Sequence, residues 1–108
     1  MTRRPALLLA VLLPALALAH GHPGNIDPAS PDAWQYRLCG EMATVAIQAL
    51  HDRDRGRPLK TFPEDGSPAA RIANDIARRV FEEPQISSPK KAETFGRGYC
   101  MERLQKQD

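Results

Sequence analysis

Two histidines near the amino terminus, in the segment His20-Gly21-His22, have the spacing of a metal site. If the chain is cleaved after Ala19, His22 becomes the third residue of the mature protein. The free amine, two deprotonated amides and the imidazole of His22 then form a square-planar nitrogen set that suits Cu(II) or Ni(II). A second arrangement uses the amine and side chain of His20 with another imidazole. Copper or nickel binding by His20 and His22 is one hypothesis, and a polar N-terminus without metal is the simpler interpretation.

A second candidate is the adjacent pair His51 and Asp52, which lies near the end of a predicted helix. Such a pair in a small disulfide-linked helical protein resembles secreted phospholipases A2, in which the His activates water and a Ca²⁺ ion stabilises the oxyanion. This chain lacks the glycine-rich calcium loop before the helix and the usual short spacing from Cys39 to the His. A small hydrolase therefore ranks third. The simpler interpretation makes His51 a cation at the carboxyl end of a helix dipole, and residues 52–55 a solvated charge run.

The third candidate is a charged cluster at the end of the same helix, beside a segment that contains Lys60 and an aromatic residue. Charged, proline-containing segments with an aromatic residue can recognise a partner protein or an anionic component of the cell envelope. The structural alternative is that Arg53 or Asp54 caps the helix or braces the long loop. The candidate partner-binding residues are Arg53, Asp54, Arg55, Arg57 and Phe62.

The chain has two cysteines, Cys39 and Cys100, so only one intramolecular disulfide can form. Closing a loop of about 60 residues would stabilise the fold by roughly 4 kcal/mol on the chain-entropy estimate. A redox pair or two metal thiolates are the alternatives, but the cysteines are distant and lie on apolar helical stripes. The pattern favours a structural disulfide.

Residues 1–19 have the pattern of a cleaved signal peptide: Arg3 and Arg4, an apolar run, and small residues at 17 and 19. The apolar run is too short for a stable membrane anchor and Pro14 interrupts it. The chain has 15 Lys and Arg, and removal of Arg3 and Arg4 leaves 13 against 13 Asp and Glu. A mature protein near neutrality has no electrostatic footprint for nucleic acid. We expect a periplasmic or secreted protein.

The predicted first helix, at about 31–55, has the start signal Ser30-Pro31-Asp32 and the stop signal Gly56. Its apolar residues form two adjacent stripes, so we expect burial over more than half its circumference. One stripe contains Trp34, Leu38, Met42, Val45 and Ala49, and the other contains Cys39, Ala43, Ala46 and Leu50.

Two further helices are predicted at about 68–83 and 89–106, and each begins with Ser-Pro. Gly96 and Gly98 lower helix propensity in the last helix, and they would allow a neighbouring helix to approach closely. Residues 20–29 are predicted to be a flexible lead-in, and 56–66 a long loop in which Leu59 and Phe62 anchor a single helical turn. No segment alternates with the period of a strand.

One pattern spans Leu38 to Met101: Cys39, an Arg53-Asp54-x-Gly56 element, Val80-Phe81-x-x-Pro84, Ser88-Pro89, Phe95 and Cys100. It resembles an uncharacterised family of small exported bacterial helical proteins with two cysteines. The aromatic residue after Val80 is often Tyr in that family and is Phe here. The resemblance implies the architecture and carries no catalytic residues.

The sequence therefore predicts an all-α protein: a signal peptide, the lead-in, and a three-helix domain at 30–108 with a Cys39–Cys100 disulfide. The leading functional hypothesis is a non-enzymatic binding or interaction module of the cell envelope, with an envelope protein as partner. N-terminal copper or nickel binding is the alternative, and a small hydrolase using His51 and Asp52 is the second alternative.

Overall fold

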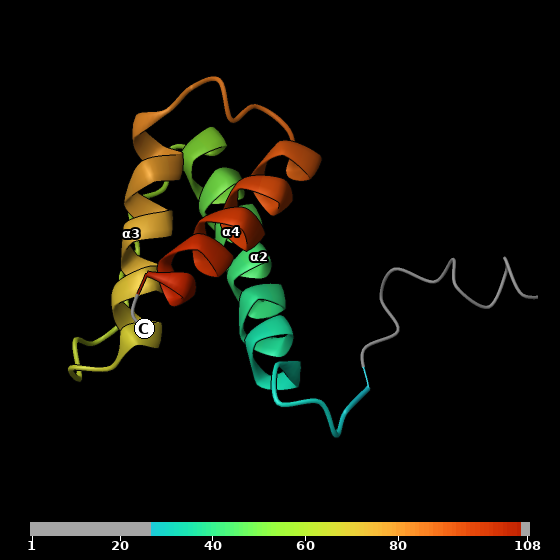
Figure 1. Ribbon diagram of the computed structural model, residues 1–108. Coiled ribbons are helices and arrows are strands. Elements are labelled where there is room, and N and C mark those ends of the chain that lie inside the picture. The colour runs from blue at the N-terminus through green and yellow to red at the C-terminus, as the bar shows by residue number, and fades with distance from the viewer. Residues whose placement is uncertain (1–26, 107–108) are drawn as a thin grey trace, which may run out of the picture. The chain divides into compact units, whose positions relative to one another are not determined.

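The computed structural model describes residues 27–106, which contain three helices and no strand: α2 (Ala33–Asp54), α3 (Pro68–Glu82) and α4 (Pro89–Gln105) (Figure 1). The prediction of an all-α domain with three helices is confirmed. The predicted signal peptide and most of the predicted lead-in lie outside the described residues. The three helices lie in the unit that begins at Pro31.

The serine of the Ser-Pro signal is the N-cap of two of the three helices. Ser67 Oγ accepts a hydrogen bond from the Ala70 N–H, and Ser88 Oγ accepts one from the Lys91 N–H, each at 3.2 Å. Both serines have the extended backbone that an N-cap requires. At Ser30 the prediction is wrong, because Pro31 and Asp32 form a turn and α2 begins two residues later, at Ala33.

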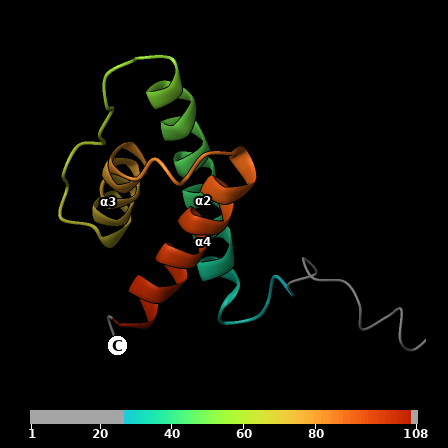
Figure 2. The same ribbon diagram turned by 90° about the horizontal axis from the view of Figure 1, so that it is seen from above.

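Helix α2 is the central element and packs against both α3 and α4, whereas α3 and α4 contact each other least. Its buried face carries Cys39, Met42, Ala43, Ala46 and other small or apolar residues. The predicted burial of Trp34 is wrong, since 50% of its surface is exposed. Trp34 lies in the first turn of α2, where the preceding residue, Ala33, is buried. The end of α2 at which this turn lies extends beyond the crossing with α4 (Figures 1 and 2).

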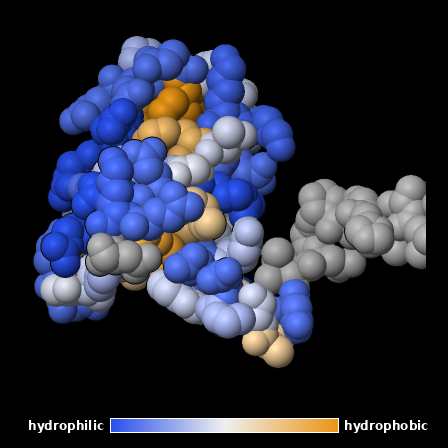
Figure 3. Space-filling model, in the orientation of Figure 1, coloured by the Kyte–Doolittle hydropathy of each residue, from blue (hydrophilic) through white to orange (hydrophobic). Residues whose placement is uncertain are grey.

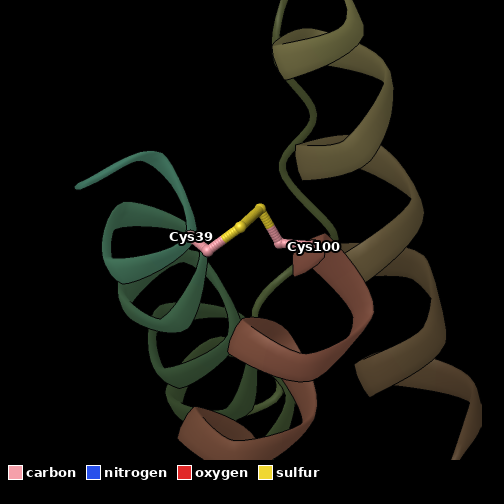
Figure 4. Close-up of a disulfide and its surroundings, with 2 residues drawn as sticks. All are labelled: Cys39 and Cys100. Atoms are coloured by element: carbon pink, nitrogen blue, oxygen red, sulfur yellow. A yellow bond between two sulfur atoms is a disulfide. The ribbon is translucent and has the colours of Figure 1, made fainter. Parts of the chain in front are cut away.

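The crossing of α2 and α4 is a contact between backbones. A Cβ placed on Gly96 would lie 2.6 Å from the carbonyl oxygen of Met42 and 2.8 Å from Ala46 Cβ. Only glycine fits at position 96, as predicted. A Cβ placed on Gly98 would meet no atom of a neighbouring element within 4 Å. The predicted disulfide closes this crossing and joins the first half of α2 to the last half of α4, with Cys39 and Cys100 Cα atoms 5.3 Å apart (Figure 4).

Polar side chains link α3 to α4. Tyr99 donates its hydroxyl hydrogen to Asp75 Oδ2 at 3.2 Å and accepts a hydrogen bond from Arg103 at 3.0 Å. The face shown in Figure 3 is largely hydrophilic, and hydrophobic atoms show mainly in a band between α3 and α4. The two helices thus meet through a polar network at the edge of the core, with α2 behind them.

Candidate functional site

A pocket of about 220 Å³ lies between α2 and α3, beneath the segment 59–62. Its floor is made by buried or half-buried residues of the two helices, and two of these are alanines, Ala49 and Ala77. Its rim is made by exposed residues of the loop. The lining residues are Val45, Gln48, Ala49, Asp52, Leu59, Lys60, Thr61, Phe62, Ala77 and Phe81.

The side chain of Asn74, which is only 1% exposed, fixes the rim of the pocket. Its Oδ1 accepts the Phe62 N–H at 2.7 Å, and its Nδ2 donates to the Phe62 carbonyl at 3.0 Å and to Glu64 Oε1 at 2.8 Å. A single amide from α3 therefore satisfies both backbone polar groups of Phe62. These bonds hold the loop against α3 over the groove between the helices.

The predicted helical turn at Leu59 and Phe62 is wrong, because residues 57–65 form an irregular segment without one. The backbone of Phe62 bonds to a side chain of α3 and so does not enter a helical hydrogen-bond ladder. Leu59 and Phe62 are nevertheless next to the core, since both line the pocket. They remain 37% and 47% exposed.

Asp52 is a buried carboxylate in the wall of the pocket, with 3% of its side chain exposed. Its Oδ1 accepts hydrogen bonds from Gln48 at 3.2 Å and from Arg57 at 3.3 Å, and its carbonyl accepts the Arg57 N–H at 2.8 Å. The interpretation of 52–55 as a solvated run is therefore wrong for Asp52. Gly56, with φ of 73°, provides the left-handed backbone that lets Arg57 reach back to Asp52.

Arg53 braces the end of α3. Its Nη1 donates to the carbonyls of Val80 at 2.7 Å and Glu83 at 3.1 Å, and its Nη2 donates to that of Ile86 at 2.7 Å. One guanidinium thus satisfies carbonyls at a helix end that lack helical partners. The bracing expected of Arg53 exists, but it acts on the connection from α3 to α4 and not on the long loop.

The residues of the predicted partner-binding cluster differ in burial and contacts, although Arg53 also pairs with Asp54 at 3.2 Å. Arg53 and Arg57 make structural hydrogen bonds, while Asp54, Arg55 and Phe62 are exposed. Arg57 is itself half exposed, so its guanidinium both holds Asp52 and faces solvent. The exposed parts of the cluster and the rim of the pocket occur in one stretch, from the last turn of α2 to residue 62.

The structure separates His51 from the pocket, although the next residue, Asp52, is in the pocket wall. Consecutive residues of an α-helix point about 100° apart, which accounts for the separation. Within residues 27–106, no group of three His, Cys, Asp or Glu side chains is placed to hold a metal ion. His20 and His22 lie outside the described residues, so N-terminal metal binding stays a prediction. Hydrolysis by His51 and Asp52 is also untested and stays a prediction.

Asn74 belongs to the candidate site but is not predicted by the sequence pattern. It belongs neither to the apolar face of α3 nor to its charged face, and this mismatch is the signal that would have found it. A polar residue between the buried Ala73 and Ile76 needs a partner inside the protein. Here the partner is the backbone of the loop.

No family model, curated protein or solved structure matches this chain. The resemblance to a family of small exported bacterial proteins therefore stays a prediction. Among the residues that the structure describes, none of the helices has the length and apolar character needed to cross a bilayer.

Proposed function

We propose that this chain is an exported, non-enzymatic binding protein of the cell envelope. Its partner would bind at a surface formed by Arg55, Arg57, Leu59, Lys60 and Phe62, which we call the loop face. The single observation that carries the proposal is the anchored backbone of Phe62 at the rim of an apolar pocket, where the side chains of Leu59 and Phe62 are exposed.

Fixing the loop in advance favours binding. A partner that orders a flexible loop loses about 0.5–1.5 kcal/mol for each immobilised side chain, and a pre-organised surface avoids part of that cost. The bonds from Asn74 to Phe62 supply this pre-organisation. Aromatic and arginine side chains are also the residues that most often dominate binding energy at interfaces.

The charge of the loop face favours an anionic partner. Arg55 and Lys60 are exposed cations, and Arg57 offers the part of its guanidinium that does not contact Asp52. Positive groups around an apolar anchor steer a negatively charged surface toward it and fix its orientation. An acidic patch on an envelope protein has the matching chemistry.

Two features support placement in the periplasm or outside the cell. A disulfide between α2 and α4 persists in an oxidising compartment and is rare in the cytosol. Residues 1–19 have the charged, apolar and small-residue regions of a signal peptide.

The proposal is tested by capture of the partner from a periplasmic extract on the immobilised mature protein, followed by identification of the bound protein. Phe62→Ala and the double variant Arg55→Glu with Lys60→Glu should each lower capture about tenfold or more, as expected for residues at the centre of an interface. The matched control is Lys90→Glu with Lys91→Glu, which reverses two exposed charges at the start of α4. If the control lowers capture as much as the loop variants, the partner does not bind at the loop face.

A further inference from the structure

We infer that the pocket between α2 and α3 binds a compact, neutral aromatic group that carries one hydrogen-bond donor, as in a phenol or an indole, with Asp52 as the acceptor. This inference rests on the proposed function for the choice of the loop face and names the group that enters it.

The size of the pocket suits a single or fused aromatic ring. Its volume is about 220 Å³. For comparison, an engineered apolar cavity of about 150 Å³ stays dry and binds benzene. The space exists because Ala49 on α2 and Ala77 on α3 are small, and segment 59–62 covers it without filling it.

The walls favour an aromatic ring. Val45, Ala49, Ala77 and Phe81 supply apolar surface in the floor, and Phe62 adds a second ring at the rim. Aromatic pairs in offset or edge-to-face contact gain about 0.5–1.5 kcal/mol beyond their area burial. Phe81 and Phe62 offer such contacts to a ring that enters the pocket.

Asp52 supplies the polar contact. Both hydrogen bonds that its side chain accepts within the described residues go to Oδ1, from Gln48 and Arg57. Oδ2 accepts none there, and because none of the fully buried side-chain polar atoms in the described residues lacks a hydrogen bond, Oδ2 is accessible in the pocket that Asp52 lines. A carboxylate oxygen in an apolar wall gains a strong bond from an O–H or N–H group of a ligand.

The surrounding charges select a neutral donor. Arg57 already balances Asp52, and Lys60 adds a further cation to the lining of the pocket. A charged ligand would lose hydration on entering the apolar pocket, and the charges there already offset one another. A phenol or an indole carries no charge and still donates its hydrogen to Asp52.

Two sources have this chemistry: a free aromatic molecule, and a Tyr or Trp side chain of a partner protein. The test uses the ¹⁵N-labelled mature protein with its disulfide intact. Amide chemical shifts are followed during titrations with p-cresol, toluene, 4-methylbenzylamine, and two capped tripeptides, Gly-Tyr-Gly and Gly-Phe-Gly.

We expect p-cresol to shift the amides of the pocket residues and to bind about tenfold or more tightly than toluene, which lacks only the hydroxyl, and than the amine. Equal binding of p-cresol and toluene, tighter binding of the amine, or shifts confined to other residues would each overturn the inference. Binding of the tyrosine peptide in preference to the phenylalanine peptide identifies a partner side chain as the source. Binding of p-cresol without either peptide identifies a free molecule.

Two variants test whether p-cresol binds in this pocket. Val45→Phe places a ring in the pocket and should abolish p-cresol binding, whereas Thr44→Phe adds the same ring to the neighbouring exposed position and should leave it unchanged. As a control, unfolding curves are recorded to check that both variants are folded. If p-cresol binds Val45→Phe as it binds the unmodified protein, the inference is wrong. If the unmodified protein captures no partner from the extract, or the loop variants capture it unchanged, while p-cresol still binds, the proposed function alone is contradicted.

Discussion

The two sides of helix α2 are built in different ways. Toward α4 the contact is between backbones, with no space for a side chain at Gly96, and a disulfide closes it. Toward α3 the helices share apolar core residues, Arg53 of α2 donates to carbonyls at the end of α3, and Asn74 of α3 holds the loop that follows α2. A pocket remains between the two helices. The tight crossing leaves no room for a side chain, whereas the looser side leaves a pocket, and our proposals place binding there.

The largest expected effect comes from removing the disulfide. The double substitution Cys39→Ala with Cys100→Ala opens a loop with a sequence separation of 61, and the free energy of unfolding should fall by about 4 kcal/mol. Urea denaturation measures the loss. A loss below about 1 kcal/mol would mean that the crossing holds without its covalent link.

Replacing each of the two glycines of α4 by alanine should change the free energy of unfolding in opposite directions. Gly96→Ala forces a Cβ against Met42 and Ala46, and we expect a loss of about 1–3 kcal/mol in unfolding free energy. Gly98→Ala has open space and should stabilise by about 0.5–1 kcal/mol through helix propensity. Denaturation of the two variants side by side measures both changes. Equal effects at the two positions would refute the backbone contact.

Replacing Arg53 should lower the free energy of unfolding more than replacing Arg55, two residues further along the chain. Arg53→Met removes the guanidinium donor from the carbonyls of Val80 and Ile86, while the Glu83 carbonyl keeps its bond from the Ile86 N–H, and we expect a loss of about 2 kcal/mol. Arg55→Met, at an exposed position, should stay within about 0.5 kcal/mol of the unmodified protein. Similar losses for both would show that the bracing of α3 contributes little.

Asn74→Ala should lower the free energy of unfolding by about 1–2 kcal/mol, because the amide that satisfies the Phe62 backbone is lost. The melting temperature of a domain of this size would fall by about 4–8 °C for each 1 kcal/mol. The matched control is Thr94→Ala at an exposed position of α4. An unchanged melting temperature for Asn74→Ala would mean that water replaces the amide at no cost.

The smallest effect concerns Asp65, which precedes α3. Its hydrogen bond from Ser67 holds the pKa of the carboxyl below its ordinary value of 3.8. A lowered pKa stabilises the folded state above pH 3.8, and this contribution disappears as the pH falls through the lowered value. An NMR titration should give a pKa below 3.8, which returns to the ordinary value in urea. A folded-state pKa at or above 3.8 contradicts the bond.

Local signals predicted the elements well. The helical periodicity, the serines at Ser67 and Ser88 and the single possible cysteine pair depend on residues near in sequence or on elimination, and the structure confirms them. Ser30 carried the same signal and failed, because the start of α2 depends on the backbone of Pro31 and Asp32. Trp34 failed because helical periodicity does not show how far along α2 the neighbouring helices extend.

The site could not be predicted in the same way. Its pocket depends on Ala49 and Ala77 facing each other from two helices, and its rim depends on a bond from Asn74 to a residue 12 positions away. Such pairings are set by helix packing, which the sequence pattern does not encode. Asp52 and Arg57 were recognised as charged, but only the structure shows that one holds the other at a pocket wall.

The central claim is that the loop face is fixed before any partner binds. Native-state hydrogen exchange at the Phe62 amide tests it most directly, because that N–H donates to Asn74. We predict that this amide exchanges at least about tenfold more slowly than an unstructured chain, and that Asn74→Ala removes the protection. Exchange at the unstructured rate in the unmodified protein would contradict the account.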